Sequence, residues 1–396
     1  MYSGRGYRDW EIGDIDIIKH GGMYHLFHLV LPNHDYIAHA VSPDCVNWTR
    51  VKNALFVGDP GEWDDDMLWT MNVVPCADGF EMFYTGLSQQ ENGFYQRVGR
   101  AVSPDLFHWT KDPTDPFPIE PHAPHYESRV DNARQWVSFR DPFHYRSASG
   151  DRYLLLCARV TRGPISRRGC VGLIHLSDQS AQQLAPLYEP RVYDDVECPA
   201  AIDLDGGHYL IGSIREDIKV RYWRAESFMG DYTSFPDNVL LPQGNYAARV
   251  TYDEGRPLLY SFYVAGTNVE TACRYFCPPK ELAVDPSGRL ALKSFANWHR
   301  KRRAHLPQES FNGFRALFGN PKAAVEQTTE RLRLKTNSGY EILAAENPFT
   351  DFVWRGRLRI HREGKLGLVF NANADADGYY VSLEPLNGFA QIRAWA

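Results

Sequence analysis

A segment of similar pattern recurs five times along this chain. Each copy is an extended stretch, a turn containing glycine, and a second stretch rich in aromatic and aliphatic residues. The five turn glycines lie 57, 71, 57 and 48 residues apart, and each interval has room for four short strands with their connections. Repeats of this size predict the blades of a β-propeller. The turn glycines are Gly22, Gly79, Gly150, Gly207 and Gly255.

A five-bladed propeller over residues 1–300 meets the burial requirement of these repeats. A single four-stranded sheet cannot cover both of its faces, whereas sheets arranged radially bury each face against a neighbour. The first strand of every blade then lines a central channel, so polar residues at the starts of those strands meet at one mouth. A pair of β-sandwiches with accidental similarity is the alternative architecture.

The C-terminal part predicts a second, smaller all-β domain. Residues 301–329 follow a basic stretch and contain Pro and Asn-Gly turn signals, which predicts a linker. Period-two alternation returns over residues 330–396 with Asn-Gly and Asp-Gly turns, which is typical of an antiparallel β-sandwich. Only five or six strands fit there, so we expect this domain to be small or truncated.

Charge and composition exclude several classes of partner. The 43 Lys and Arg residues against 49 Asp and Glu give a net charge of −6, which offers nucleic acid or an anionic lipid surface no general attraction. There is no apolar run of membrane-spanning length, and the residues after Met1 lack a charged-then-apolar pattern, so we expect no leader. The seven scattered cysteines predict free thiols. We therefore expect a cytoplasmic protein without nucleic-acid or membrane partners, and the oligomeric state stays open.

Three of the five first strands carry an acid near their start: Asp14, Asp141 and Glu197. In a propeller all three side chains would enter one axial pocket. Burial and mutual repulsion raise the pKa of whichever carboxyl group stays protonated. Two carboxyl groups with separated pKa values are what glycoside hydrolysis requires, one as proton donor and the other as nucleophile or base.

The motifs around these acids resemble glycoside hydrolase families 32 and 68, the fructan-processing enzymes, with family 43 more distantly similar. The stretches Phe139–Pro142 (Phe-Arg-Asp-Pro) and Glu197–Pro199 (Glu-Cys-Pro) match the family pattern letter for letter. The stretches Met23–Phe27 and His39–Ser42 look like the first-blade sequence that surrounds the substrate pocket in these families. The resemblance covers nearly the whole chain.

The resemblance implies a retaining hydrolase of β-fructofuranosides, such as sucrose or fructo-oligosaccharides, that needs no cofactor. It implies Asp14 as nucleophile, Asp141 as stabiliser of the transition state and Glu197 as general acid and base. Arg140 would orient and charge-pair groups within the site. A family-43-like inverting arabinofuranosidase or xylosidase is one alternative. Another alternative is a propeller that binds sugar but does not hydrolyse it, because a fold by itself does not imply an activity.

The first motif departs from the family pattern Trp-Met-Asn-Asp-Pro-Asn-Gly. This chain has Gly13-Asp14-Ile15-Asp16, without the Asn and Pro. Asp14 and Asp16 are two residues apart, and such residues face the same way on a strand, so periodicity alone does not choose between them. We favour Asp14, which lies ten residues before Tyr24, where divergent family members place their first acid.

Three further residues are candidates for substrate binding: Trp69, Asp66 and His39. An indole packs on the apolar face of a sugar and an acid accepts hydrogen bonds from its hydroxyl groups. Alternatively, Trp69 belongs to the blade core and Asp66 caps a surface loop. His39 could border the pocket. We predict no metal site, because adjacent acids on extended chain cannot all point at one ion.

Overall fold

The computed structural model describes residues 2–3, 11–130, 134–177, 180–265, 273–297, 311–346, 352, 354, 356–362 and 364–395. It divides into two compact units, Met1–Lys301 and Arg302–Ala396. In its described parts the chain has no helix long and apolar enough to cross a membrane. Short 3₁₀ turns occur at η1 (Gln89–Glu91), η2 (Ile165–Arg167), η3 (Phe311–Gly313) and η4 (Pro385–Asn387).

Over its described residues the first unit forms five antiparallel sheets, each built from strands that follow one another along the chain. Blade 1 contains β1 (Glu11–His20), β2 (Met23–Leu31), β3 (Tyr36–Ser42), β4 (Thr49–Arg50) and β5 (Leu55–Phe56); blade 2 contains β6 (Met67–Cys76), β7 (Gly79–Leu87), β8 (Arg97–Ser103) and β9 (Thr110–Lys111); blade 3 contains β10 (Phe139–Arg146), β11 (Arg152–Arg159), β12 (Gly169–Leu176) and β13 (Ala181–Tyr188); blade 4 contains β14 (Glu197–Leu204), β15 (Gly207–Ile214), β16 (Lys219–Ala225) and β17 (Val239–Leu241); blade 5 contains β18 (Asn245–Asp253), β19 (Arg256–Ala265), β20 (Cys273–Phe276), β21 (Lys280–Val284) and β22 (Leu290–Ser294).

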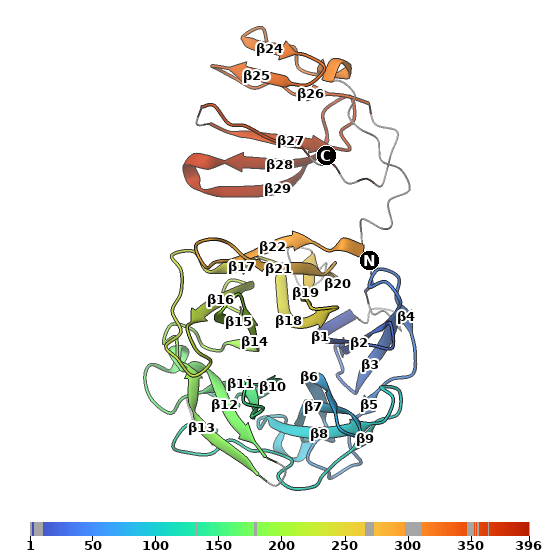
Figure 1. Ribbon diagram of the computed structural model, residues 1–396, viewed down its shortest axis with the longest axis vertical. Helices are drawn as coiled ribbons and strands as arrows, with labels where there is room; N and C mark the ends of the chain where they lie inside the picture. Colours follow the sequence, from blue (N-terminus) through green and yellow to red (C-terminus); the bar gives the residue numbers. More distant parts are fainter. Residues whose placement is uncertain are drawn as a thin grey trace. The chain divides into compact units, whose positions relative to one another are not determined.

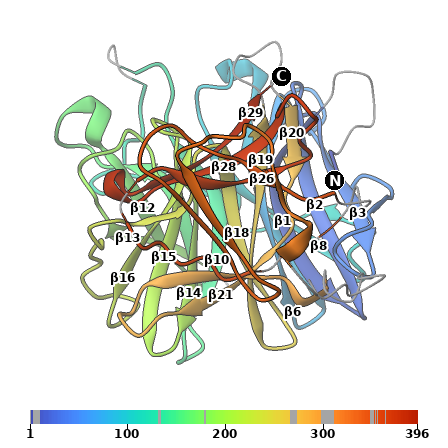
Figure 2. The ribbon, with the colours of Figure 1, turned by 90° about the horizontal axis from the view of Figure 1, so that it is seen from above.

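The first strands of the five sheets close into a ring. β1 contacts β6, β6 contacts β10, β10 contacts β14, β14 contacts β18, and β18 contacts β1. Figure 1 shows the five sheets radiating from this centre. In the turned view of Figure 2 the long strands run roughly along the direction from which Figure 1 is viewed, which is therefore the axis of the propeller. The predicted five-bladed propeller is confirmed.

The hydrophobic cores lie between neighbouring blades. Blades 1 and 5, for example, share a cluster in which Ile17 and Leu26 pack with Leu258 and Tyr260, all buried. Because both faces of a blade are covered, middle strands such as β2 are buried along nearly their whole length, and an alternating pattern is lost there. This packing holds the inner strands, and the side chains at their starts, in fixed places around the axis.

A ten-residue motif, Ala-Val-Ser-Pro-Asp-x-x-x-Trp-Thr, builds the same turn in blades 1 and 2. Asp44 Oδ1 accepts the backbone N–H groups of the second and third residues after it, both at 2.9 Å. Asp105 Oδ1 accepts the equivalent pair at 2.9 and 2.8 Å. The motif therefore shapes the connection between the third and fourth strands of each blade.

In its described residues the second unit also consists of strands and short turns, and it corresponds to the predicted C-terminal β-sandwich. Two of its strands, β23 and β24, lie within residues 301–329, so the part of that interval after residue 310 belongs to these sheets and is not a linker. The pattern did not reveal them because β23 is only two residues long and β24 is largely exposed. Residues 301–310 lie outside the described residues. The sheets pair β23 (Arg315–Ala316) with β26 (Leu343–Ala344), β24 (Ala323–Gln327) with β25 (Leu332–Thr336), and β27 (Leu366–Phe370) with β28 (Gly378–Glu384) and β29 (Phe389–Trp395).

Candidate active site

Every inner strand carries an irregularity near its start. The pairing with the second strand of the same blade shifts register there, which is the signature of a β-bulge. At three of these bulges a residue other than glycine has a positive φ: 61° at Asp141, 47° at Cys198 and 49° at Ala247. Strained backbone of this kind clusters at functional sites. The register shifts fall between Ile12 and Ile15, Trp69 and Met71, Arg140 and Phe143, Glu197 and Ala200, and Tyr246 and Arg249.

The three predicted carboxyl residues all belong to these bulges, but at staggered positions. Regular pairing resumes one residue after Asp14, two after Asp141 and three after Glu197. The acids are therefore not equivalent in the repeat, although each lies at the start of its inner strand. A bulge re-aims the side chains of its strand, so three different offsets can direct carboxyl groups toward one place.

Asp14 and Asp141 converge on Cys198. One oxygen of each carboxyl group and the sulfur of Cys198 all lie within 4.8 Å of one another. Cys198 Sγ donates to Asp14 Oδ2 at 3.5 Å, and the Cys198 backbone N–H donates to Asp141 Oδ2 at 2.9 Å. Thr70 of blade 2 also donates its hydroxyl hydrogen to Asp14. Four blades thus contribute to a single cluster around the axis.

This cluster contains three side chains of metal-ligand type, and hydrogen bonds join them. Burial raises the pKa of the Cys198 thiol well above its ordinary value, so the sulfur keeps the hydrogen that it donates to Asp14. Asp141 is already bound by a backbone N–H group. Hydrogen bonds therefore hold the three side chains together, and the absence of a metal site stays a prediction.

Glu197 is held from both sides. Arg140 Nη2 lies 2.6 Å from Glu197 Oε1, and the hydroxyl group of Tyr246 donates to Glu197 Oε2. The side chain of Glu197 is 15% exposed, so it is largely buried among these partners. Arg140 itself is buried and also lies 3.6 Å from Asp141 through its Nε. The predicted charge-pairing role of Arg140 agrees with these contacts.

Arg140 is anchored by a residue that the sequence analysis missed. Asp195, two residues before Glu197, accepts from Arg140 Nη2 and from Arg134 Nη2, each at 2.9 Å. Gln96 Oε1 accepts from Arg140 Nη1 at 3.3 Å. Burial would raise the pKa of Asp195, but the two arginines hold it below its ordinary value. The only sign of it in the sequence was its position two residues before Glu197, a spacing that places both side chains on the same side of an extended chain.

All three predicted catalytic acids hold protons more tightly than in water. Burial raises the pKa of Asp14; the hydrogen bond from Thr70 opposes this rise, and the negative charge of Glu197 adds to it. Burial also raises the pKa of Asp141 and of Glu197, in each case against the positive charge of Arg140. The site is therefore arranged so that one of its carboxyl groups can stay protonated near neutral pH.

Asp16 occupies a different environment from Asp14. Its Oδ2 accepts from the backbone N–H of Val73 at 2.6 Å and from Asn72 Nδ2 at 3.1 Å, so it ties β1 to β6. Asp14 lies inside the bulge that ends at Ile15, and the rule that residues two apart share a face fails there. The structure brings Asp14, and not Asp16, together with Asp141.

Two of the expected substrate-binding residues, Trp69 and Asp66, lie close to Thr70 in the sequence. Trp69 precedes Thr70 on β6, and its indole N–H is buried without a hydrogen-bond partner among the described residues. Its ring is 5.8 Å from that of His34. Asp66 lies just before β6 and is partly exposed; burial and the charge of Asp65 raise its pKa. Their contacts with a sugar stay a prediction.

The expectation that His39 borders the pocket is wrong. His39 lies on β3, the third strand of blade 1, and is fully buried. Its ring stacks on Phe27 at a centroid distance of 4.4 Å, and its Nε2 lies 3.1 Å from His25 Nδ1. Only the first strand of a blade lines the channel, so a third-strand residue packs between blades instead.

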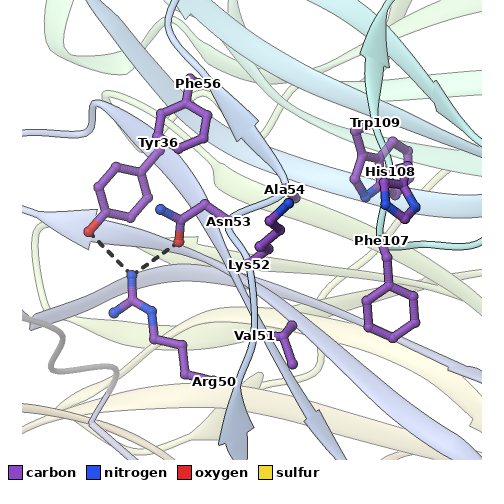
Figure 3. Close-up of a pocket in the computed structure, with 10 residues that line it drawn as sticks. All are labelled: Tyr36, Arg50, Val51, Lys52, Asn53, Ala54, Phe56, Phe107, His108 and Trp109. Atoms are coloured by element: carbon purple, nitrogen blue, oxygen red, sulfur yellow. Dashed lines mark hydrogen bonds between the residues drawn. The ribbon is translucent and has the colours of Figure 1, made fainter.

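An open pocket of about 920 Å³ lies elsewhere on the first unit (Figure 3). It is formed by the outer strands of blade 1 and the turn between β8 and β9. Figure 3 shows Tyr36 and Phe56 on one side and Phe107 and Trp109 on the other. None of the predicted site residues lines it. The carboxyl cluster on the axis is therefore a separate feature.

The fold and the site define a five-bladed propeller that carries a cluster of carboxyl groups on its axis. The chain matches the family "Glycosyl hydrolases family 32 N-terminal domain" over residues 14–269, which include all three acids. The protein belongs to glycosyl hydrolase family 32.

Two proteins of similar sequence are plant enzymes. A cell-wall isozyme of β-fructofuranosidase from Zea mays is 26% identical over 262 residues, which are 59% of this chain and 41% of the relative. The corresponding isozyme from Pisum sativum is 28% identical over 133 residues, which are 32% of this chain and 22% of the relative. The chain thus matches less than half the length of either relative.

Solved structures share the fold at low sequence identity. Fructan 1-exohydrolase IIa from Cichorium intybus superposes with a TM-score of 0.61 at 18% identity, over 76% of this chain and 61% of that one. A family 32 β-fructofuranosidase of Bombyx mori gives 0.59 at 16% identity, over 77% of this chain and 67% of that one. A thermostable family-43 glycoside hydrolase gives 0.54 at 18% identity, over 78% and 98%.

Proposed function

We propose that the protein is a retaining glycoside hydrolase that acts on β-fructofuranosides such as sucrose or fructo-oligosaccharides. The observation that carries this proposal is the cluster on the axis, where oxygens of Asp14 and Asp141 lie within 4.8 Å of Cys198 Sγ and Glu197 is held by Arg140 and Tyr246. Membership of family 32 and the activities named for its relatives point to the same substrate class.

In the first step of the proposed mechanism, Glu197 donates its proton to the glycosidic oxygen as the bond to the fructosyl carbon breaks. Asp14 attacks that carbon and forms a fructosyl ester. The raised pKa of Glu197 suits a proton donor, and the hydrogen bonds from Thr70 and Cys198 stabilise the negative charge on Asp14. Asp141 accepts hydrogen bonds from sugar hydroxyl groups.

In the second step, Glu197 removes a proton from water, which attacks the same carbon and releases fructose and free Asp14. Arg140 stays bound to Glu197 Oε1 and Asp195 in both steps, which fixes the orientation of the carboxyl group. The site needs no cofactor, because the two carboxyl groups supply both the proton and the nucleophile.

A substrate panel tests the proposed function. Purified protein is incubated with sucrose, inulin-type and levan-type oligosaccharides and aryl arabinofuranosides, and the released sugars are measured. We expect fructose release, with the first product anomer of retained configuration by NMR. Release of arabinose with inversion would favour the family-43-like alternative, and binding without release would favour a sugar-binding propeller.

The separation of two carboxyl groups gives an independent test of the mechanism. Retention requires Asp14 and Glu197 about 5–5.5 Å apart, whereas inversion needs roughly 6.5–9.5 Å to accommodate a water. A crystal structure with a bound, slowly hydrolysed substrate measures this distance. A separation in the longer range would contradict the proposed nucleophilic role of Asp14.

We also propose a cytoplasmic location. The support is chemical: the structure contains seven free cysteines, several of them buried, and reduced thiols are typical of proteins that stay in a reducing compartment. Cell fractionation with an antibody against the protein tests this. Recovery in the secreted fraction would contradict it.

A further inference from the structure

Arg249 is a buried cation that crosses from one blade to two others. It follows the bulge of β18 in blade 5 and is 1% exposed. Its Nη1 donates to the backbone oxygen of Pro199 at 2.7 Å, and its Nη2 donates to that of Pro142 at 3.2 Å. These two prolines follow Cys198 and Asp141 directly, so the guanidinium group joins the bulges of β14 and β10.

The surroundings of Arg249 compensate its charge without a direct ion pair. The described residues offer its guanidinium group two carbonyl oxygens, and its Nε is buried without a hydrogen-bond partner among them. The ring of Phe143 lies 5.7 Å from the guanidinium carbon. A buried charge is costly unless neighbouring dipoles and opposite charges stabilise it. The nearby carboxyl groups of the inner strands supply that stabilisation.

We propose that Arg249 is a positioning residue of the active site: it clamps the bulges that aim Asp141 and Glu197, and its positive charge lets the carboxyl groups on the axis lie close together. This inference rests on the proposed hydrolase function. Arg249 touches neither the expected sugar nor the reacting atoms. It acts through the backbone of its neighbours and through its electrostatic field.

The charge acts on groups from several strands. From β1 it faces Asp14 and Asp16, and from β10 it faces Asp141. Burial raises the pKa of each of these three acids, and the positive charge of Arg249 opposes that rise in every case. Among the described residues, the site also contains Arg140 on β10, Asp195 before β14, Glu197 and Cys198 on β14, and Tyr246 on β18.

Removal of the charge therefore has a predictable sign. Without Arg249 the pKa of Asp14 rises further, and a nucleophile must be ionised to attack. The acidic limb of the pH profile of kcat/KM then moves to higher pH. Arg140 cannot replace the lost charge, because its guanidinium group is already bound to Asp195 and Glu197.

Two substitutions separate the clamp from the charge. Arg249→Met removes both; we expect the acidic limb to rise by about 0.5 to 1 pH unit and kcat to fall roughly 10²-fold, with KM changed less. Arg249→Lys keeps the charge but reaches only one carbonyl oxygen; we expect a wild-type acidic limb and a kcat that falls about tenfold. The measurements are pH profiles on sucrose and melting temperatures.

Arg221→Met is the matched control, because Arg221 is also a propeller arginine but lies on the third strand of blade 4 and is bonded to Asn238 and Asp217. Its profile should match the wild type. Arg249→Gln, which lacks the charge but keeps an amide donor, replaces the methionine variant if that variant does not fold. If the wild type is active and the charge-free variant has the same acidic limb as the wild type, the inference about Arg249 is overturned. A wild type that cleaves no substrate would instead refute the proposed function, and this inference with it.

Discussion

At the scale of single residues, the site depends on which groups touch which carboxyl group. Asp14 accepts hydrogen bonds from Thr70 and Cys198, whereas Glu197 accepts them from Arg140 and Tyr246. Donors stabilise the charged form of a carboxyl group, and burial favours the protonated form. The two acids therefore have different sets of donors, and burial raises the pKa of both.

Replacement of Glu197 by Gln tests the proton donor. We expect kcat on sucrose to fall at least about 10²-fold, because general acid catalysis contributes roughly 10² to 10⁴. The loss should be much smaller on a fructoside whose leaving group needs no proton. Exposed Glu254→Gln serves as control. Equal losses on both substrates would mean that Glu197 binds sugar and does not transfer protons.

Asp14→Asn and Asp16→Asn distinguish the nucleophile from its neighbour. An amide cannot form the fructosyl ester, so Asp14→Asn should lose nearly all turnover while it still binds substrate and unfolds at a normal temperature. Asp16→Asn should retain most activity. A fluorinated fructosyl label located on Asp16 by peptide mass mapping would reverse the two roles.

Asp16 also predicts a pH dependence of stability. Burial raises the pKa of Asp16 to about 7 in the folded protein. The folded state then holds this proton more tightly than the unfolded state, so the wild type loses stability as pH rises from about 4 to about 7. Relative to Asp16→Asn the loss should be roughly 2 to 4 kcal/mol, measured by urea unfolding across this range. A constant difference between the two proteins would show that Asp16 does not titrate there.

At the scale of elements, the β-bulges and the Ser-Pro-Asp turns have different tasks. The bulges interrupt the inner strands and turn staggered residues toward the axis. The turns lie at the outer end of the third strands and satisfy backbone N–H groups there. The bulges therefore orient active-site side chains, and the turns stabilise the blades.

Asp44→Ala and Asp105→Ala test the turns. Each substitution removes a carboxylate that accepts two backbone N–H groups. Asp44→Ala should lower the melting temperature by about 2–4 °C, as expected for the loss of roughly 1 kcal/mol. Asp105→Ala should change it in the same direction, and kcat should not change in either variant. A loss of activity without a loss of stability would contradict a purely structural role.

At the scale of the whole propeller, the ring closes where blade 5 meets blade 1. The backbone oxygen of Tyr2 accepts from Phe276 N–H at 2.8 Å, and Ser3 O accepts from Ile12 N–H at 3.1 Å. Asp253 of blade 5 bonds to Lys19 and to the hydroxyl group of Tyr24 in blade 1. Closure matters for function because Asp14 of blade 1 must stay in register with Glu197 of blade 4.

Asp253→Ala tests this closure. Burial raises the pKa of Asp253, but hydrogen bonds from Lys19 and Tyr24 outweigh it and hold the pKa below its ordinary value. Asp253 therefore stabilises the fold above pH about 4, and this contribution is lost as pH falls below that value. We expect a loss of about 2–4 kcal/mol at neutral pH, most of which disappears in acid. An equal loss at pH 3 and pH 7 would contradict this account.

The sequence alone predicted the number of blades, the all-β class, and the places of Asp141 and Glu197 near the starts of inner strands. These features are local, because a strand-turn-strand unit is encoded within about 20 residues. Its repetition along the chain predicts that the units stack against one another. The motifs around Asp141 and Glu197 are equally compact. Such signals can be read because each depends only on neighbours along the chain.

Which side chains meet depends on how the blades pack, and the sequence pattern did not reveal it. Strand periodicity left Asp14 and Asp16 undecided, and a bulge breaks that periodicity. His39 was misplaced because its burial depends on a partner from blade 2, Phe107, as well as on its own strand. Arg249 reaches two carbonyl oxygens 50 and 107 residues away in the chain. Contacts between blades depend on how the sheets pack around the axis, and no pattern within one blade contains that information.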